Sequence, residues 1–412
     1  MTTLPLAGIR VLDLSRLLPG PFCSLLLADY GAEVVKVEDT GMGDYVRWAT
    51  PSVAGVEESA KSVRFLALNR NKASIRLNLK DPAGREAFLT LVEGADVVLE
   101  SFRPGVMERL GVGYAALRER NPGIVLCAIS GYGADGPLTA RPGHDLNYLG
   151  LVGLLGLTGE ADGPPVQAAG QIADVGGGAL LAAFGILAAL RERDRSGEGQ
   201  FVDVSMADGA LSWLAMDAAR ALQGEPQRRG EMELGGRFVC YRPYACADGW
   251  VTLGALKPKF FQAFCRGVGR EDLVPGQFDA PGGEVHAQLE ALFAARTRAD
   301  WTAFAAEHAC CLEPVLELEE ALDSELVRAR GMVVELDQPG AAEPVRLVGP
   351  PVKLSRTPAD PARRPAPGLG EDTAAVLEAA GYGAEAIAAL LASGAAAGLP
   401  DAGAAAPGSF LS

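Results

Sequence analysis

The first 130 residues alternate between short apolar stretches and amphipathic ones, and this alternation limits the possible folds more than any other feature of the chain. Apolar stretches of strand length predict strands at 8–14, 33–38, 73–79, 96–100 and 124–129. Helical patterns lie between them, over about 19–31, 81–93 and 105–120. Strands that alternate with helices predict an α/β fold, a doubly wound parallel sheet whose ligand binds at the carboxyl ends of the strands.

The remaining sequence predicts a second, smaller domain and a return to the first. Residues 1–218 are expected to form the N-terminal part of a large domain, 219–233 a linker, and 234–325 a small α+β domain. Residues 326–393 are expected to complete the large domain. The segment 394–412 is mostly Ala, Gly and Pro, so we expect it to be disordered. The apolar run from Ala179 to Leu190 predicts a buried helix, too short to span a bilayer.

Composition restricts the partners of the protein. The formal net charge of −15 argues against nucleic acid and anionic membranes, because both require a net basic surface on the protein. The N-terminus lacks the basic and apolar regions of a secretory signal, and the seven cysteines do not have metal-binding spacing. We therefore expect a cytoplasmic protein with reduced thiols and no metal site.

His144 is the best placed of the three histidines to take part in chemistry. It lies in Arg-Pro-Gly-His-Asp-Leu-Asn-Tyr, residues 141–148, beside the carboxylate of Asp145. The simplest structural explanation is a buried histidine that bonds to Asp145. The functional alternative is a general base.

Asp174 precedes three glycines at the start of the apolar helix. A carboxylate in this position can simply cap the helix. The glycines suggest a second role, because residues without side chains let a ligand approach the main-chain N–H groups at a helix N-terminus, where an oxyanion would be stabilised. A base and a carboxylate that face one carbon acid could move a proton on either face of it.

Local positive charge leaves room for a polyanionic ligand. The candidates are Lys36, Arg47, Arg70, Lys72 and Arg103, although each one alone is most simply a solvated surface charge. The turn Pro19-Gly20-Pro21 lacks the glycine pattern of a dinucleotide site, so a nicotinamide cofactor is not expected.

Several segments together resemble the class III CoA-transferase family, and within it the α-methylacyl-CoA racemases. They are residues 8–14, 19–21, 31–38, 43–47, 69–72, 100–105, 129–133, 197–204, 248–249 and 369–373. The resemblance implies a Rossmann-like large domain built from both ends of the chain, a small domain between them, and an interlocked homodimer. It also implies an acyl-CoA thioester as substrate, no separate cofactor, and CoA contacts from the five basic residues and from Gly131, Tyr132 and Gly133.

The same resemblance assigns chemistry to the two candidate residues. Asp174 matches an aspartate that transferases of the family use as a nucleophile and racemases use as an acid or base. His144 lies in a segment similar to the racemase histidine motif, and Leu18 stands where formyl-CoA-type transferases place a glutamine. Arg242 and Lys257 depart from the racemase pattern, because acidic residues are frequent at those positions.

We therefore expect an isomerase, a racemase that epimerises the α-carbon of a 2-methylacyl-CoA through an enolate, in lipid metabolism. Two alternatives stay open. One is a CoA-transferase that moves CoA to a carboxylic acid through a thioester on Asp174. The other is a CoA-ester binding protein without catalysis.

Overall fold

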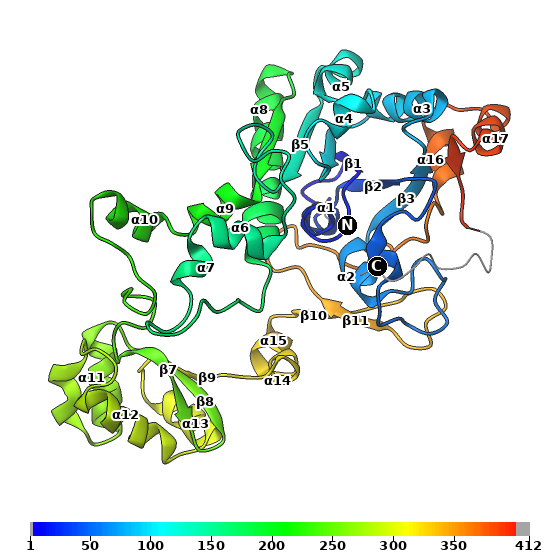
Figure 1. Cartoon of the computed structure of the whole chain (residues 1–412). Helices are drawn as coiled ribbons and strands as arrows, with labels where there is room; N and C mark the ends of the chain where they lie inside the picture. The colour runs from blue at the N-terminus through cyan, green and yellow to red at the C-terminus, as the bar shows by residue number, and fades with distance from the viewer. Residues whose placement is uncertain (1–2, 401–412) are drawn as a thin grey trace. The chain divides into compact units, whose positions relative to one another are not determined.

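The chain, described in the computed structural model over residues 3–400, divides into two compact units. The larger unit contains the chain up to Val152, Gly170–Trp213 and the chain from Leu326 onward, and the smaller unit contains Gly153–Ala169 and Leu214–Glu325. Figure 1 shows the chain coloured from its N-terminus to its C-terminus, so the blue and red ends can be followed into the same sheet.

A seven-stranded sheet with the order β12-β3-β2-β1-β4-β5-β6 forms the larger unit. Its strands are β1 (Arg10–Asp13), β2 (Glu33–Glu38), β3 (Lys72–Leu77), β4 (Val97–Glu100), β5 (Val125–Ser130), β6 (Phe201–Ser205) and β12 (Ala396–Ala397). All neighbours pair in parallel except β12, which runs antiparallel to β3. The predicted parallel α/β fold is confirmed, and the order of its six parallel strands is that of doubly wound nucleotide-binding sheets.

Helices pack on the sheet because the strands are apolar on both sides. The helices of the larger unit are α1 (Pro19–Asp29), α2 (Val63–Asn69), α3 (Pro82–Glu93), α4 (Val106–Arg109), α5 (Tyr114–Arg120), α6 (Asp145–Leu151), α8 (Leu180–Ser196), α9 (Met206–Ser212), α16 (Thr373–Ala379) and α17 (Ala384–Ser393), with the helical turn η1 (Tyr45–Trp48). One core contains the strand residues Leu12, Val35, Ile75 and Val98 with side chains of α3, α5, α16 and α17. The antiparallel pair β10 (Val333–Leu336) and β11 (Val345–Val348) packs in a second cluster with α2.

The smaller unit is an antiparallel sheet with helices. Its strands are β7 (Tyr241–Cys246), β8 (Gly249–Gly254) and β9 (Leu312–Pro314), and its helical segments are α7 (Leu154–Leu157), α10 (Ala215–Leu222), α11 (Pro258–Gly267), η3 (Glu271–Gly276), α12 (Glu284–Ala294), α13 (Arg298–Glu307) and α14 (Leu318–Leu322). The short helix α15 (Glu325–Ala329) lies at the boundary between the units. Aromatic rings stack in the core of the smaller unit, where the ring centroids of Phe264 and Phe293 lie 5.3 Å apart.

The structure differs from the predicted domain boundaries in three places. Residues 153–169 and 214–218, predicted in the large domain, belong to the smaller unit, and the predicted linker 219–233 also lies within that unit, beginning in α10. Residues 394–400 were expected to be disordered, but Ala396 and Ala397 pair with β3 as an edge strand. The rest of that segment, 401–412, lies outside the described residues.

Two helices that the sequence pattern predicts as continuous, over 105–120 and over 372–391, are each broken at a glycine. Gly111, with φ of 74°, separates α4 from α5, and Gly381, with φ of 94°, separates α16 from α17. A positive φ ends a right-handed helix and strains residues that carry a Cβ, so both breaks follow from the glycine. The pattern of apolar residues continues across each break and conceals it.

The apolar helix is longer than the sequence predicted. The segment η2 (Ile172–Ala179) runs directly into α8, and Ile172–Ser196 is long and apolar enough, by length and composition, to cross a membrane. Only half of its most apolar window is buried within the protein. The prediction of a helix buried on all sides is therefore wrong for the face that carries Leu180, Phe184 and Leu187, which are exposed.

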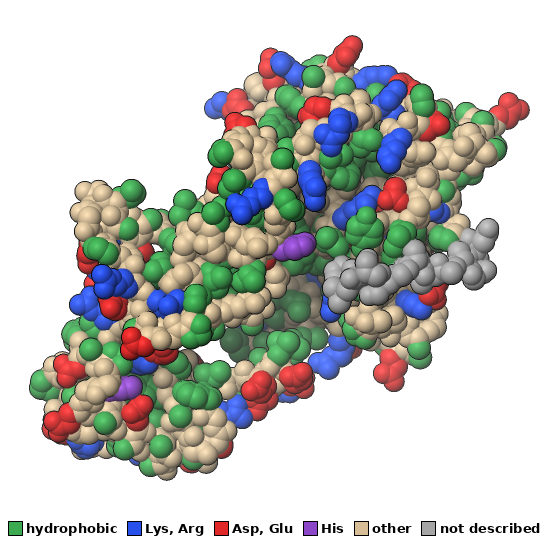
Figure 2. All heavy atoms as spheres, viewed as in Figure 1, with side chains coloured by type: hydrophobic (Ala, Val, Ile, Leu, Met, Phe, Trp, Pro, Cys, Tyr) green, Lys and Arg blue, Asp and Glu red, His purple; other side chains and the backbone are tan. Residues whose placement is uncertain are grey.

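Acidic and basic side chains are interspersed over the face shown in Figure 2, so the acidic excess does not form one patch there.

Candidate active site

A cavity of about 730 Å³ opens at the carboxyl ends of the strands in the larger unit. The loops that follow β1, β4 and β5 line it, together with the start of α6, the η2 segment and the start of α9. The lining residues are Arg16, Leu17, Pro19, Tyr45, Ser101–Pro104, Ile129–Tyr132, Thr139, Arg141–His144, Asn147, Tyr148, Asp174 and Met206. His144 and Asp174, which are 30 positions apart in the sequence, line this one cavity.

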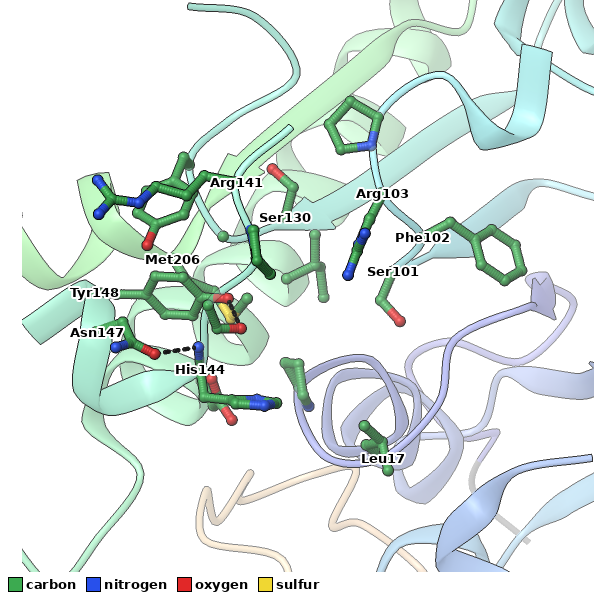
Figure 3. Close-up of a pocket in the computed structure, with 18 of the residues that line it drawn as sticks. Leu17, Ser101, Phe102, Arg103, Ser130, Arg141, His144, Asn147, Tyr148 and Met206 are labelled. Carbon is green, nitrogen blue, oxygen red and sulfur yellow. Dashed lines mark hydrogen bonds between the residues drawn. The ribbon is translucent and has the colours of Figure 1, made fainter. Parts of the chain in front are cut away.

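His144 stands at the first turn of α6 with its side chain exposed. Its backbone N–H donates to the Asn147 side-chain oxygen at 3.0 Å, and its carbonyl accepts from the Asn147 N–H at 2.8 Å. Figure 3 shows the imidazole extending from this turn into the cavity. The interpretation of His144 as a buried histidine that bonds to Asp145 is therefore wrong, because His144 is exposed and Asp145 is buried among other partners.

Asp145 bonds to the main chain at Asp174. One carboxylate oxygen, Oδ1, accepts the N–H of Ala173 at 2.7 Å and the N–H of Asp174 at 3.0 Å. The N–H of Val175 donates to the Gln171 carbonyl at 2.9 Å. The first N–H groups of this helix are thus already paired, which contradicts the expectation that they would stabilise an oxyanion.

The environment of Asp174 favours its neutral form. Burial of the largely buried carboxyl raises its pKa to about 6 from 3.8, the negative charge of Asp145 adds to the rise, and His144 opposes it. A carboxyl group with a pKa near neutrality can serve as an acid in one direction of a proton transfer and as a base in the other.

The three glycines after Asp174 pack against protein. A Cβ on Gly177 would lie 2.8 Å from the Met206 carbonyl oxygen, and one on Gly176 would lie 2.1 Å from the Trp213 ring. A Cβ on Gly209 of α9 would likewise collide with backbone atoms of Gly177. The glycines therefore allow η2 and α9 to pack together, and the prediction that they admit a ligand is wrong.

The buried Tyr148 supports the loop that leads to His144, here called the histidine loop. Its hydroxyl donates to the Gly143 carbonyl at 2.6 Å, and its ring meets Tyr132 edge-on at 5.1 Å between centroids. A Cβ on Gly131 would lie 2.6 Å from the Tyr148 ring, which explains the glycine at that position. Of the three residues expected to contact CoA in this loop, Gly131 and Tyr132 line the cavity, whereas Gly133 lies outside it and donates to the Ser130 hydroxyl.

Of the five basic residues, Arg103 is exposed and lines the cavity, where Figure 3 shows its side chain extending into the opening. The other four are buried in ion pairs within the fold. They pair as Lys36 with Asp44 at 2.9 Å, Arg47 with Glu38 at 2.6 Å, Arg70 with Asp29 at 2.7 Å and Lys72 with Asp13 at 3.5 Å.

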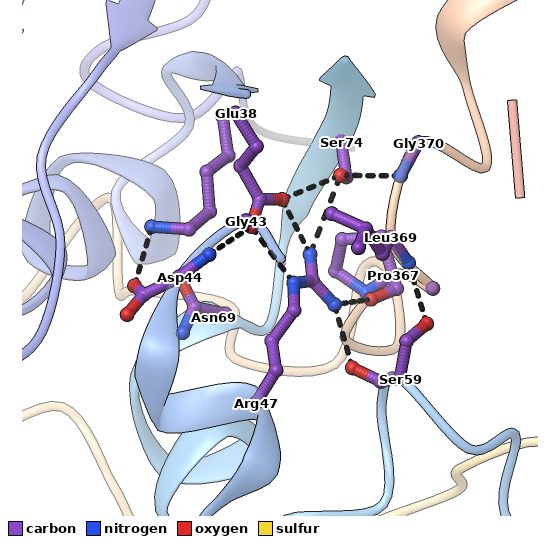
Figure 4. A network of polar contacts seen from close by, with 12 residues as sticks. Glu38, Gly43, Asp44, Arg47, Ser59, Asn69, Ser74, Pro367, Leu369 and Gly370 are labelled. Atoms are coloured by element: carbon purple, nitrogen blue, oxygen red, sulfur yellow. Dashed lines mark hydrogen bonds and ion pairs between the residues drawn. The ribbon is translucent and has the colours of Figure 1, made fainter. Parts of the chain in front are cut away.

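The pairs of Lys36 and Arg47 belong to one polar network, which reaches Ser59, Ser74 and the return segment at Pro367 (Figure 4). Burial alone would raise the pKa of Glu38, but Arg47, Lys36 and the Ser74 hydroxyl together outweigh burial and lower this pKa to about 2. A buried cation neutralised in this way is not available to a phosphate. The expected CoA contacts of Lys36, Arg47, Arg70 and Lys72 are therefore corrected to structural roles.

Arg16 and Arg141 are two further cations that line the cavity, and neither was predicted from the sequence to do so. Arg16 follows the end of β1 and pairs with Asp39 at 2.6 Å, and Arg141 lies three residues before His144. The signals that could have identified them are the position of Arg16 at a strand end and the position of Arg141 in the segment that contains His144. Leu17, which follows Arg16 and also lines the cavity, has a φ of 66° and donates its N–H to the Asp44 carboxylate at 3.1 Å. A non-glycine residue in this conformation carries strain of about 1–3 kcal/mol, which often marks a functional site.

Comparison with known proteins extends over nearly the whole chain. The model of CoA-transferase family III matches residues 6–373. A succinyl-CoA:mesaconate CoA-transferase of Haloarcula hispanica is 38% identical over 92% of this chain and 97% of its own. The α-methylacyl-CoA racemase of Mus musculus is 36% identical over 93% of this chain and 95% of its own. A crystal structure of a CAIB/BAIF family protein from Brucella suis superposes with a TM-score of 0.79 at 29% identity, covering 92% of this chain and 100% of that one.

Proposed function

The chain belongs to CoA-transferase family III, and from this premise we propose that it is an acyl-CoA racemase acting on a 2-methylacyl-CoA or a similar α-branched thioester. The observation that carries the proposal is that His144 and Asp174 line the same cavity. A racemase needs one group on each face of the α-carbon, and a nucleophilic mechanism at Asp174 does not need the histidine.

The reaction would be a 1,1-proton transfer without a resident cofactor. Neutral His144 removes the α-proton from one enantiomer, and the C–H electron pair moves into the thioester to form an enolate. Neutral Asp174 then gives its proton to the opposite face of the α-carbon, and the roles exchange in the reverse direction. Because the histidine becomes positively charged as the enolate forms, its charge helps to stabilise the intermediate inside the cavity.

CoA would enter as part of the substrate, with Arg103 as the cation for its phosphates. An arginine that lines the cavity and is exposed can bind phosphate through two N–H groups. Arg141 also lines the cavity and is exposed, so it is a second candidate for this contact.

We also propose that the protein is a homodimer. Leu180, Phe184 and Leu187 follow one another at helical spacing along α8, and all three are exposed, Phe184 by 71%. Exposed apolar side chains on one face of a helix favour a protein partner. A second copy of this chain would cover them, and light scattering of the purified protein measures its mass directly.

The racemase proposal is tested by incubating an enantiopure 2-methylacyl-CoA with the protein in deuterated water, without an acceptor acid. The expected result is incorporation of one deuteron together with loss of enantiomeric purity, and His144→Ala and Asp174→Ala should each slow racemisation by about 100-fold or more. Retained enantiomeric purity and no deuterium would exclude the racemase.

A CoA-transferase is the second candidate, favoured by the 38% identity to a mesaconate CoA-transferase. In that mechanism the Asp174 carboxylate attacks the thioester carbonyl and releases CoA thiolate, leaving a mixed anhydride. The thiolate then attacks the aspartyl carbonyl and releases the free acid, which leaves CoA on Asp174 for an acceptor carboxylate. Incubation with succinyl-CoA and mesaconate tests it: a new thioester that needs Asp174 but survives His144→Ala would support the transferase.

A further inference from the structure

We propose that Asp145 is a positioning residue that holds the two catalytic groups at a fixed separation across the cavity, an inference that rests on the proposed racemase. Asp145 follows His144 directly, and its carboxylate binds the two consecutive N–H groups at Ala173 and Asp174. One side chain therefore connects the turn that carries the base to the turn that carries the acid.

Burial makes this connection firm. Asp145 is 5% exposed, so its carboxylate is screened little by water, and hydrogen bonds from N–H groups to a charged oxygen are stronger than those to a neutral one. Its Oδ1 accepts both N–H groups, at 2.7 and 3.0 Å. Loss of this carboxylate would leave two buried N–H groups without their partner at the segment that positions Asp174.

His144 is held from the same turn. Its own N–H is bound by the Asn147 side chain, and the Gly143 carbonyl before it is bound by Tyr148. Side chains of α6 therefore form hydrogen bonds to the backbone at both His144 and Asp174. A displacement of about 1 Å between catalytic groups can cost about 100-fold in rate, so this rigidity matters for the chemistry.

Asp145 also places a negative charge beside Asp174. Burial comes first among the causes that raise the pKa of Asp174, followed by the charge of Asp145, and His144 acts in the opposite direction. Tyr148 of α6 is a further titratable neighbour. The other elements packed against η2 are α1, α8, α9, β5 and β6. Their titratable and charged residues are Cys23 and Asp29 in α1, residues 191–195 in α8, Asp208 in α9, Cys127 in β5 and Asp203 in β6.

Two substitutions separate the hydrogen bonds from the charge. Asp145→Asn keeps an oxygen that can accept both N–H groups but removes the charge, whereas Asp145→Ala removes both. Asp135→Asn is the matched control, since Asp135 is exposed in the loop before α6 and the substitution changes the charge equally.

For Asp145→Ala we expect kcat for racemisation to fall about 100-fold with KM within about threefold of wild type, because positioning is lost and the CoA contacts are not. For Asp145→Asn we expect a smaller fall, of about tenfold. Its pH–rate profile should move to lower pH, because the pKa of Asp174 falls when the neighbouring negative charge is removed. Asp135→Asn should match wild type in kcat and in profile.

A kcat within twofold of wild type for Asp145→Ala would overturn the positioning role, and an unmoved profile for Asp145→Asn would overturn the electrostatic one. A measurement that does not need turnover separates this inference from the reaction. The carboxyl carbon of Asp174, followed by NMR in ¹³C-aspartate-labelled protein and assigned with Asp174→Asn, should titrate at lower pH in Asp145→Asn than in wild type. If wild type racemises nothing but this titration still moves, the racemase is wrong and the coupling stands. If the titration does not move, the coupling is wrong whatever the reaction.

Discussion

Arg47 offers a direct test of whether the buried cations are structural. The side chain is fully buried, pairs with Glu38 through two N–H groups at 2.8 and 2.6 Å, and donates to the carbonyls of Ser59 and Pro367. Its guanidinium also lies 3.8 Å from the centre of the Phe65 ring. Replacing it with methionine keeps a similar apolar length but leaves the Glu38 carboxylate buried without its countercharge.

Breaking a buried pair by removing one partner costs about 3–5 kcal/mol. The low pKa of Glu38, about 2 instead of 4.5, agrees in direction, because it shows that the folded protein favours the ionised carboxylate; burial raises this pKa, and Arg47, Lys36 and Ser74 together lower it. For a unit of this size, Arg47→Met should therefore lower the Tm by about 5–10 °C.

The effect should depend on pH. In wild type the pKa of Glu38 is lowered by folding, so its stabilisation is complete above about pH 4.5 and is lost as the pH falls toward 2. In Arg47→Met burial raises that pKa, so protonation relieves the unpaired charge. The difference in Tm between the two proteins should be greatest at neutral pH. It should shrink as the pH falls through the raised pKa of Glu38 in Arg47→Met and on toward the wild-type value of about 2.

The assay is thermal unfolding of wild type, Arg47→Met and Arg103→Met between pH 3 and pH 7, with KM for an acyl-CoA measured alongside. Arg103→Met is the matched control, because Arg103 is exposed at the cavity. We expect it to leave the Tm within about 1 °C and to raise KM about tenfold or more. If Arg47→Met keeps the wild-type Tm and raises KM instead, the conclusion that Arg47 is structural is refuted.

Three further predictions concern the cavity and its walls. Gly177→Ala should destabilise the protein by about 1–3 kcal/mol, because its Cβ would meet the backbone of α9. Gly170→Ala is the control and should be neutral, because no atom lies within 4 Å of the added Cβ. Urea unfolding measures the stability of both variants. Tyr148→Phe should lower kcat for racemisation about tenfold with an unchanged Tm, since it removes the hydroxyl that holds the histidine loop, and an unchanged kcat would show that the loop does not need this anchor. In the direction of racemisation that uses Asp174 as base, the rate should fall as the pH drops below about 6, because the carboxylate must be ionised. Racemisation rates measured from each enantiomer against pH check this prediction. A rate that stays constant from pH 5 to pH 7 would contradict it.

The sequence by itself determined the class of fold and the edge of the sheet at which the cavity lies. Strand and helix periods are local properties, so the five predicted strands correspond to β1 to β5 with ends shifted by at most two residues. A parallel sheet has its ligand at the carboxyl ends of the strands, and the cavity lies there. His144 could be predicted as a candidate catalytic residue because the chain has only three histidines. Asp174 could be predicted because it precedes three glycines at the start of an apolar helix.

Only the tertiary structure decided what most of the other polar residues do. Arg47 bonds to Pro367 across 320 positions of sequence, and Asp145 bonds to the backbone at Asp174 across 29. Such pairings depend on which strands become neighbours and in which register, and a local pattern does not carry this information. A basic residue near a strand end therefore predicts a phosphate contact as readily as a buried ion pair, and only the packing around it distinguishes Arg103 from Arg47.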